Sequence, residues 1–90
     1  MQEIHVIVIG RVQGIGFRAK VKQLAESLHL TGYVRNLSNG DVEICAQGDA
    51  AELNHLTQQI QQAFTSYIQN MKIIQRNPNI LHSEFRITLV

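Results

Sequence analysis

The stretch GYVRNLSNGDVEICAQG, residues 32–48, decides the fold because it holds a complete β-hairpin. Two strand-like runs, residues 33–37 and 41–47, flank the turn Ser38-Asn39-Gly40. Asn-Gly supplies the positive φ angles that a tight hairpin turn requires. The sequence therefore predicts two neighbouring antiparallel strands in the middle of the chain.

One strand and one helix are predicted before the hairpin. Residues 4–9 form a β-branched run with apolar residues on both faces, which favours a central strand. From Phe17 the apolar spacing changes to three and four residues, as on one face of a helix. The residues on that face are Phe17, Val21, Leu24 and Leu28. We expect Gly32 to end this helix.

A second helix and two further strands are predicted after the hairpin. Asp49 and Glu52 have the spacing of a capping box at a helix start. The apolar face of this helix would consist of Leu53, Leu56, Ile60, Ala63 and Tyr67. Residues 71–75 and 84–90 are strand-like, so each is expected to form a strand.

The order of these elements predicts an α+β fold. Strand, helix, strand, strand, helix, strand and a terminal strand match a ferredoxin-like two-layer sandwich, βαββαβ plus one strand. In this plan two helices pack on one face of a mostly antiparallel sheet. With 90 residues, 44% of them hydrophobic, and only one proline, the chain has no linker, so we expect a single domain over residues 1–90.

Charge and cysteine content limit the possible partners and location. A net charge of +1 is too small to attract nucleic acid or an acidic membrane by charge alone. The start of the chain lacks a basic signal region, and residues 4–9 are too few to span a bilayer. We therefore expect a cytoplasmic protein without nucleic-acid or membrane partners, a monomer, with Cys45 as a buried structural thiol.

A glycine-rich corner follows the first strand. Gly10, Gly14 and Gly16 allow the backbone to turn its N–H groups inward, and the next helix adds unpaired N–H groups at its start. Arg18 in the first turn offers paired donors to a phosphate or carboxylate. A plain turn beside a solvated arginine remains an alternative, because short glycine patterns are common and the Lys-Ser/Thr ending of a P-loop is absent.

Two motifs together resemble the acylphosphatase family. GRVQGIGFR, residues 10–18, matches its first signature, and GYVRNLSNGDVEICAQG, residues 32–48, matches its second at the required interval. The resemblance is strong over residues 4–48 and weaker afterwards, apart from the closing strand around Glu84-Phe85-Arg86-Ile87. Two features depart from the family. Ala19 stands where a bulkier residue is common beside the arginine, and residues 65–70 replace the usual glycine- and proline-rich break after the second helix.

The resemblance implies hydrolysis of small acyl phosphates to a carboxylate and inorganic phosphate. By analogy, Arg18 and the loop amides bind the phosphoryl group, and Asn36 orients the attacking water. The substrate-binding residues implied are Val12, Gln13, Gly14, Ile15, Gly16, Phe17 and Arg18. Inorganic phosphate or sulfate would then compete with the substrate.

Other polar residues are expected to have no catalytic part. His5, His29, His55 and His82 are scattered, and no His, Cys, Asp or Glu cluster has metal-ligand spacing, so we expect neither metal nor cofactor. Asp41 and Glu43 are expected on a solvated strand face.

Two other functions remain open. A phosphate-binding module would hold the anion without turnover, as an acylphosphatase-like domain in a larger carbamoyl-phosphate enzyme could. An RNA-binding domain of the same topology needs exposed aromatic residues on its central strands, a pattern that this chain lacks.

Overall fold

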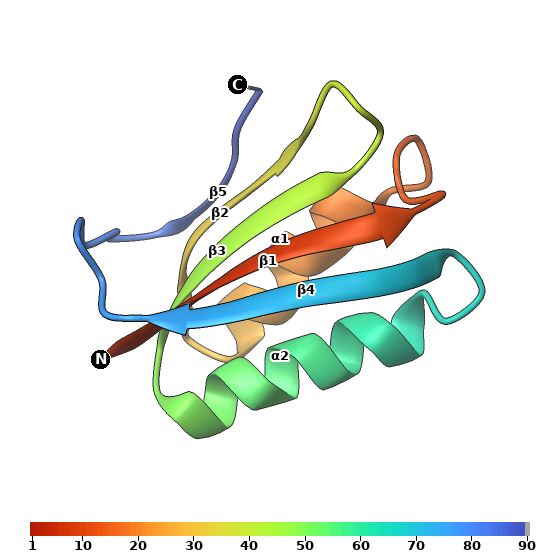
Figure 1. The fold of residues 1–90 in the computed structure, drawn as a ribbon. Helices are drawn as coiled ribbons and strands as arrows, with labels where there is room; N and C mark the ends of the chain where they lie inside the picture. Colours follow the sequence, from red (N-terminus) through yellow and green to blue (C-terminus); the bar gives the residue numbers. More distant parts are fainter. Residues whose placement is uncertain (90) are drawn as a thin grey trace.

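The computed structural model describes residues 1–89 as one sheet with two helices on one of its faces (Figure 1). The elements in chain order are β1 (Gln2–Gly10), α1 (Phe17–Ser27), β2 (Thr31–Asn36), β3 (Val42–Gly48), α2 (Ala50–Ala63), β4 (Ile68–Arg76) and β5 (Phe85–Ile87). The strands lie in the order β4-β1-β3-β2-β5, with all neighbours antiparallel except the parallel pair β2 and β5. The predicted ferredoxin-like plan with a terminal strand is confirmed.

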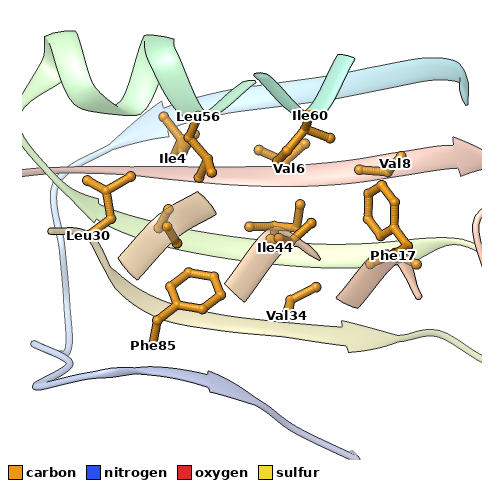
Figure 2. Packing of buried hydrophobic residues seen from close by; sticks show 14 of the residues in the cluster. Ile4, Val6, Val8, Phe17, Leu30, Val34, Ile44, Leu56, Ile60 and Phe85 are labelled. Carbon is orange, nitrogen blue, oxygen red and sulfur yellow. The ribbon is translucent and has the colours of Figure 1, made fainter. Parts of the chain in front are cut away.

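The core lies between the helices and the near face of the sheet. Ile4, Val6 and Val8 of β1 face the helices and are opposite Ala46, Ile44 and Val42 of β3, all of them buried. Figure 2 shows the side chains of β1 and Ile44 of β3 close to Leu56 and Ile60 of α2 and to Phe17 of α1, within one buried cluster. β1 is central, as predicted, because β3 and β4 flank it on its two sides.

The opposite face of the sheet is largely polar, and here the expectation for Glu43 is wrong. Glu43 is 9% exposed and binds two partners: His5 Nε2 lies 2.6 Å from its Oε2, and the Nε of Arg35 donates to its Oε1. The reason is the strand order, since β3 lies between β1 and β2, which supply these two residues. Asp41 precedes β3 and does not share this environment.

Cys45 on the same polar face is buried, as predicted. Burial, together with the neighbouring Glu3 carboxylate, raises the pKa of its thiol to about 12. The thiol is therefore protonated and unreactive at neutral pH, as expected for a structural cysteine.

The first helix ends earlier than Gly32. α1 stops at Ser27, and the backbone N–H of Leu30 closes the helix by donating to the Ala25 carbonyl at 2.9 Å. His29, with a φ of 58°, takes the left-handed conformation that glycine usually provides after a helix. Gly32 lies inside β2 instead.

The second helix also ends before its predicted limit. α2 stops at Ala63, which is exposed, and Phe64 continues the buried face by packing on Phe17 with ring centroids 4.8 Å apart. Tyr67 lies in a turn, where its N–H donates to the Phe64 carbonyl at 2.9 Å, and it is 40% exposed.

Three element ends differ from expectation in smaller ways. Asp49 is the N-cap of α2 but makes no side-chain capping bond, and Glu52 lies 3.3 Å from His55 instead, so the capping box is not formed. β4 begins at Ile68, directly after the turn, and is longer than predicted. β5 is shorter than residues 84–90, and Val90 lies outside the described residues.

Candidate active site

The loop between β1 and α1, residues 11–16, forms one wall of a surface hollow. Gly14 and Gly16 both have a φ of 79°, the left-handed region in which a side chain is strained. A Cβ atom at either position would meet nothing within 4 Å, so glycine is needed there for the backbone direction and not for space. Val12, 1% exposed, fixes the loop to the core.

The start of α1 presents free backbone donors beside this loop. The N-cap residue Gly16 makes no side-chain capping bond, and the first turn contains no acidic residue. The first intrahelical bond runs from Lys20 N–H to the Gly16 carbonyl at 3.1 Å, so the N–H groups of residues 17–19 have no partner within the helix. Together with the helix dipole, they make this end favourable for an anion.

The hollow has a volume of about 200 Å³. Its lining residues are Val12, Gly14, Gly16, Phe17, Arg18, Ala19 and Ile87. Arg18 is partly exposed, and within residues 1–89 no carboxylate lies within ion-pair distance of it. Its guanidinium is therefore available to an anion held at the helix start.

Gln13 connects the loop to the hairpin and does not line the hollow. Its Nε2 donates to the Leu37 carbonyl at 2.8 Å and to the Asp41 carbonyl at 3.0 Å. Leu37 and Asp41 are the two ends of the β2–β3 turn, joined by a bond from Leu37 N–H to the Asp41 carbonyl at 2.8 Å. Ile15, 37% exposed, is also absent from the lining.

Asn36 is the last residue of β2 and directly precedes Leu37. It lies opposite Val42 and on the same strand face as Val34, both of which are buried beneath the helices. Its Oδ1 is buried and, within the described part of the chain, has no hydrogen-bond partner. An unpaired buried acceptor is costly, so this oxygen is suited to accept a bond from a small bound molecule.

Other classes of site find little support. Residues 1–89 contain no group of three or more His, Cys, Asp or Glu side chains that could hold a metal ion. No helix in the described chain is long and apolar enough to cross a bilayer.

The chain is similar in sequence and in fold to known proteins. The profile of the acylphosphatase family matches residues 4–87. The chain belongs to the acylphosphatase family. An acylphosphatase of Chlorobaculum tepidum is 38% identical over 87 residues, which are 96% of this chain and 95% of that protein. An acylphosphatase of Methylococcus capsulatus is 50% identical over 56 residues, 62% of this chain and 61% of that protein.

Solved acylphosphatase structures extend the match to the whole fold. The crystal structure of acylphosphatase from Bacillus subtilis superposes with a TM-score of 0.91 at 31% identity, covering 98% of this chain and 99% of that one. In sequence, the chain of this protein spans only about three fifths of the length of three curated acylphosphatases that it matches, those of Methylococcus capsulatus and of two Coxiella burnetii strains. The family and the fold are thus shown, in agreement with the resemblance of the two signatures.

The lining of the hollow includes one residue that the signatures did not indicate. Ile87 comes from β5, far from both signatures, and lies next to Arg18 only because β5 pairs with β2. The apolar closing strand was visible in the sequence, but no local pattern connected it to the glycine loop. Ala19, noted in the sequence as a departure from the family, also lines the hollow.

Proposed function

We propose that this chain is an acylphosphatase that hydrolyses small acyl phosphates to a carboxylate and inorganic phosphate. The observation that carries the proposal is the common hollow where the glycine loop, the uncapped start of α1 and Arg18 meet. An acyl phosphate presents a negatively charged phosphoryl group, which is the ligand chemistry that these donors favour. Family membership supports the same activity.

Phosphoryl binding is assigned to the loop and to Arg18. The N–H groups around Gly14, Gly16 and the first turn of α1 would surround the equatorial oxygens, and the guanidinium would take two of them. A loose phosphoryl-transfer transition state spreads charge over these oxygens, and preorganised donors stabilise it where it develops. These groups supply the positive charge without a metal ion, so we propose a metal-independent reaction.

Water positioning is assigned to Asn36. Its unpaired Oδ1 can accept an O–H bond from a water and direct the lone pair of that water toward phosphorus. An amide does not titrate, so the contribution is orientation and not base catalysis. Gln13 supports this arrangement, because it fixes the residue after Asn36 to the glycine loop.

The reaction balances without a further reagent. The water oxygen forms a bond to phosphorus while the bond from phosphorus to the acyl oxygen breaks, and its electron pair leaves with the carboxylate. The carboxylate is a good leaving group and needs no proton, so the water proton passes to a phosphoryl oxygen. No general acid is therefore required at the site.

Turnover of acetyl and benzoyl phosphate in excess chelator tests these assignments. We expect the wild type to be active. Arg18→Ala should lower kcat/KM by about a thousandfold or more, since it removes the positive charge that stabilises the transferred phosphoryl group. Asn36→Ala should lower it by about a hundredfold. Inhibition by inorganic phosphate should weaken strongly in Arg18→Ala and change less than about threefold in Asn36→Ala, because of these two side chains only the arginine is assigned to the anion.

Two matched variants control for charge and for unspecific effects. Arg11→Ala removes an exposed arginine of the same loop that does not line the hollow, and Asn54→Ala removes an exposed asparagine of α2. Both should retain wild-type kinetics. A folded wild type that binds phosphate but hydrolyses neither substrate would contradict the enzyme proposal and favour a phosphate-binding module.

A further inference from the structure

The hollow beside the glycine loop has an apolar side that phosphoryl binding does not use. Ile87, the last residue of β5, lines it together with Arg18 and lies opposite Val34 of β2 in parallel register. Phe85, two residues earlier on the same face, is 2% exposed and belongs to the core. Ile87 is 39% exposed, so a large part of its side chain remains open to a ligand in the hollow.

Ala19 lies on the helix side of the same hollow. It belongs to the first turn of α1, is exposed, and presents only a methyl group. Val12 and Phe17, each 1% exposed, form a buried apolar floor. The hollow therefore has two chemically different parts: backbone N–H groups and a guanidinium in one, and the Ile87 and Ala19 side chains in the other.

An acyl phosphate has the same division between an anionic head and a carbon skeleton. With the phosphoryl group at the N–H groups of the loop, the acyl group has the apolar surface of the hollow beside it. We propose that Ile87 and Ala19 form the acyl-group subsite, and that Ile87 favours substrates with a bulky apolar acyl group over acetyl phosphate. This inference rests on the proposed function and identifies the part of the hollow that selects the substrate.

The size of the effect follows from the partial exposure of Ile87. One methylene group in an enclosed hydrophobic pocket changes kcat/KM by about tenfold or more. The Ile87 side chain is larger than one methylene, but its subsite is open on one side, so we expect a discrimination of about tenfold. Acetyl phosphate carries one methyl group and gains little from the same contact.

The test compares kcat/KM for benzoyl and acetyl phosphate in the wild type, Ile87→Ala and Ile87→Leu. Ile87→Ala should lower the benzoyl phosphate value by about tenfold and the acetyl phosphate value by less than about threefold, and Ile87→Leu should restore most of the difference. In Ala19→Leu a larger side chain extends into the hollow, so benzoyl phosphate should again lose more than acetyl phosphate. Inhibition by inorganic phosphate reports that the anion donors remain in place.

Ile73→Ala is the matched control, because Ile73 is 49% exposed and lies on β4, at the opposite edge of the sheet. It should leave the ratio of the two substrates unchanged. An equal loss for both substrates in Ile87→Ala, with an unchanged ratio, would show a structural role and overturn the inference.

A binding measurement separates this inference from the proposed function. Benzoylphosphonate and acetylphosphonate keep the acyl group and the anion but resist hydrolysis, and calorimetry gives their affinities in the same variants. A wild type without turnover that still prefers benzoylphosphonate, and loses the preference in Ile87→Ala, would contradict the proposed hydrolysis and support the subsite. Equal affinities of the wild type for the two phosphonates would overturn the subsite, whatever the turnover.

Discussion

At the scale of single residues, Gln13 connects the glycine loop of the first signature to the hairpin turn of the second. Its amide nitrogen donates to the Leu37 and Asp41 carbonyls and so fixes the glycine loop to the turn that follows Asn36. Gln13→Ala removes both bonds, and a shift of about 1 Å between Arg18 and Asn36 can cost about a hundredfold in rate. We therefore expect kcat/KM for acetyl phosphate to fall by about ten- to a hundredfold, mainly through kcat.

The same variant should change stability only slightly. Two hydrogen bonds from an exposed side chain contribute about 0.5 kcal/mol each, so the melting temperature should fall by about 4–8 °C, and the protein should remain folded at the assay temperature. Gln13→Glu, which keeps the size but cannot donate, should behave like Gln13→Ala, and Gln58→Ala on α2 should behave like the wild type. A variant with full kcat would show that the loop keeps its position without Gln13.

At the scale of elements, β5 is held beside β2 by a side chain from β3. Gln47 Nε2 donates to the Ile80 carbonyl at 2.6 Å, and its Oε1 accepts from His82 N–H at 3.0 Å. These bonds tie the segment between β4 and β5 across the polar face of the sheet, while Gln47 also donates to the buried Glu3 carboxylate at 2.7 Å. We therefore expect these bonds to help keep β5, and with it Ile87, in position.

Gln47→Leu should therefore loosen β5 selectively. The backbone bonds that attach β5 to β2 run from Gly32 N–H to the Glu84 carbonyl and from Thr88 N–H to the Val34 carbonyl, each 3.0 Å long. Hydrogen exchange at the Thr88 amide should become at least tenfold faster, and the free energy of unfolding should fall by about 2 kcal/mol, because Glu3 loses a buried partner.

Gln75→Leu is the control for this prediction, since Gln75 is an exposed glutamine of β4 whose side chain donates to Gln2. It should leave Thr88 exchange unchanged. If hydrogen exchange in Gln47→Leu were accelerated equally at Thr88 and throughout β4, the variant would be destabilised globally. That result would contradict a specific role of Gln47 in holding β5.

At the scale of the whole molecule, the sequence predicted the fold because its local signals agree with one another. The Asn39-Gly40 turn, the helical spacing after Phe17 and the β-branched run of residues 4–9 each specify one element, and packing both helices on one face of the sheet buries their apolar sides together. The ends of elements were less predictable. At the end of α1, His29 takes the left-handed conformation that glycine usually provides. After α2, the Phe64 carbonyl accepts a turn bond from Tyr67 N–H. The spacing of apolar residues does not indicate either feature.

The candidate site likewise contains residues that the sequence predicted and residues that it did not. The loop and Arg18 are contiguous, so their pattern predicted an anion-binding loop. Val12, Gly14, Gly16, Phe17 and Arg18 line one hollow, whereas Gln13 and Ile15 do not. Ile87 and the pairing of Glu43 with His5 and Arg35 depend on strand order, which links residues distant in the chain. The hydrogen bond from Gln13 to the hairpin likewise could not be predicted, because it joins two loops that are distant in the sequence.

The polar face of the sheet gives the molecule a predictable acid sensitivity. Burial by itself would raise the pKa values of Glu3 and Glu43, but their hydrogen-bonded partners lower them below the ordinary value of 4.5. These partners are Gln47 and Arg76 for Glu3, and His5 and Arg35 for Glu43. Because each folded-state pKa is lower than the unfolded-state value, ionisation stabilises the fold above about pH 4.5, and this stability is lost as the pH falls through the lower, folded-state values.

Urea unfolding between pH 7 and pH 2.5 checks this prediction. The wild-type free energy of unfolding should be nearly flat above pH 5 and should fall steeply below pH 4.5, where the unfolded chain binds more protons than the folded one. Glu43→Gln should be less stable by about 2 kcal/mol at pH 7, since Arg35 and His5 lose a charged partner, and its acid limb should be shallower. Glu26→Gln, at an exposed pair with Lys22, should follow the wild-type curve, so an equally steep acid limb in Glu43→Gln would place the sensitivity elsewhere.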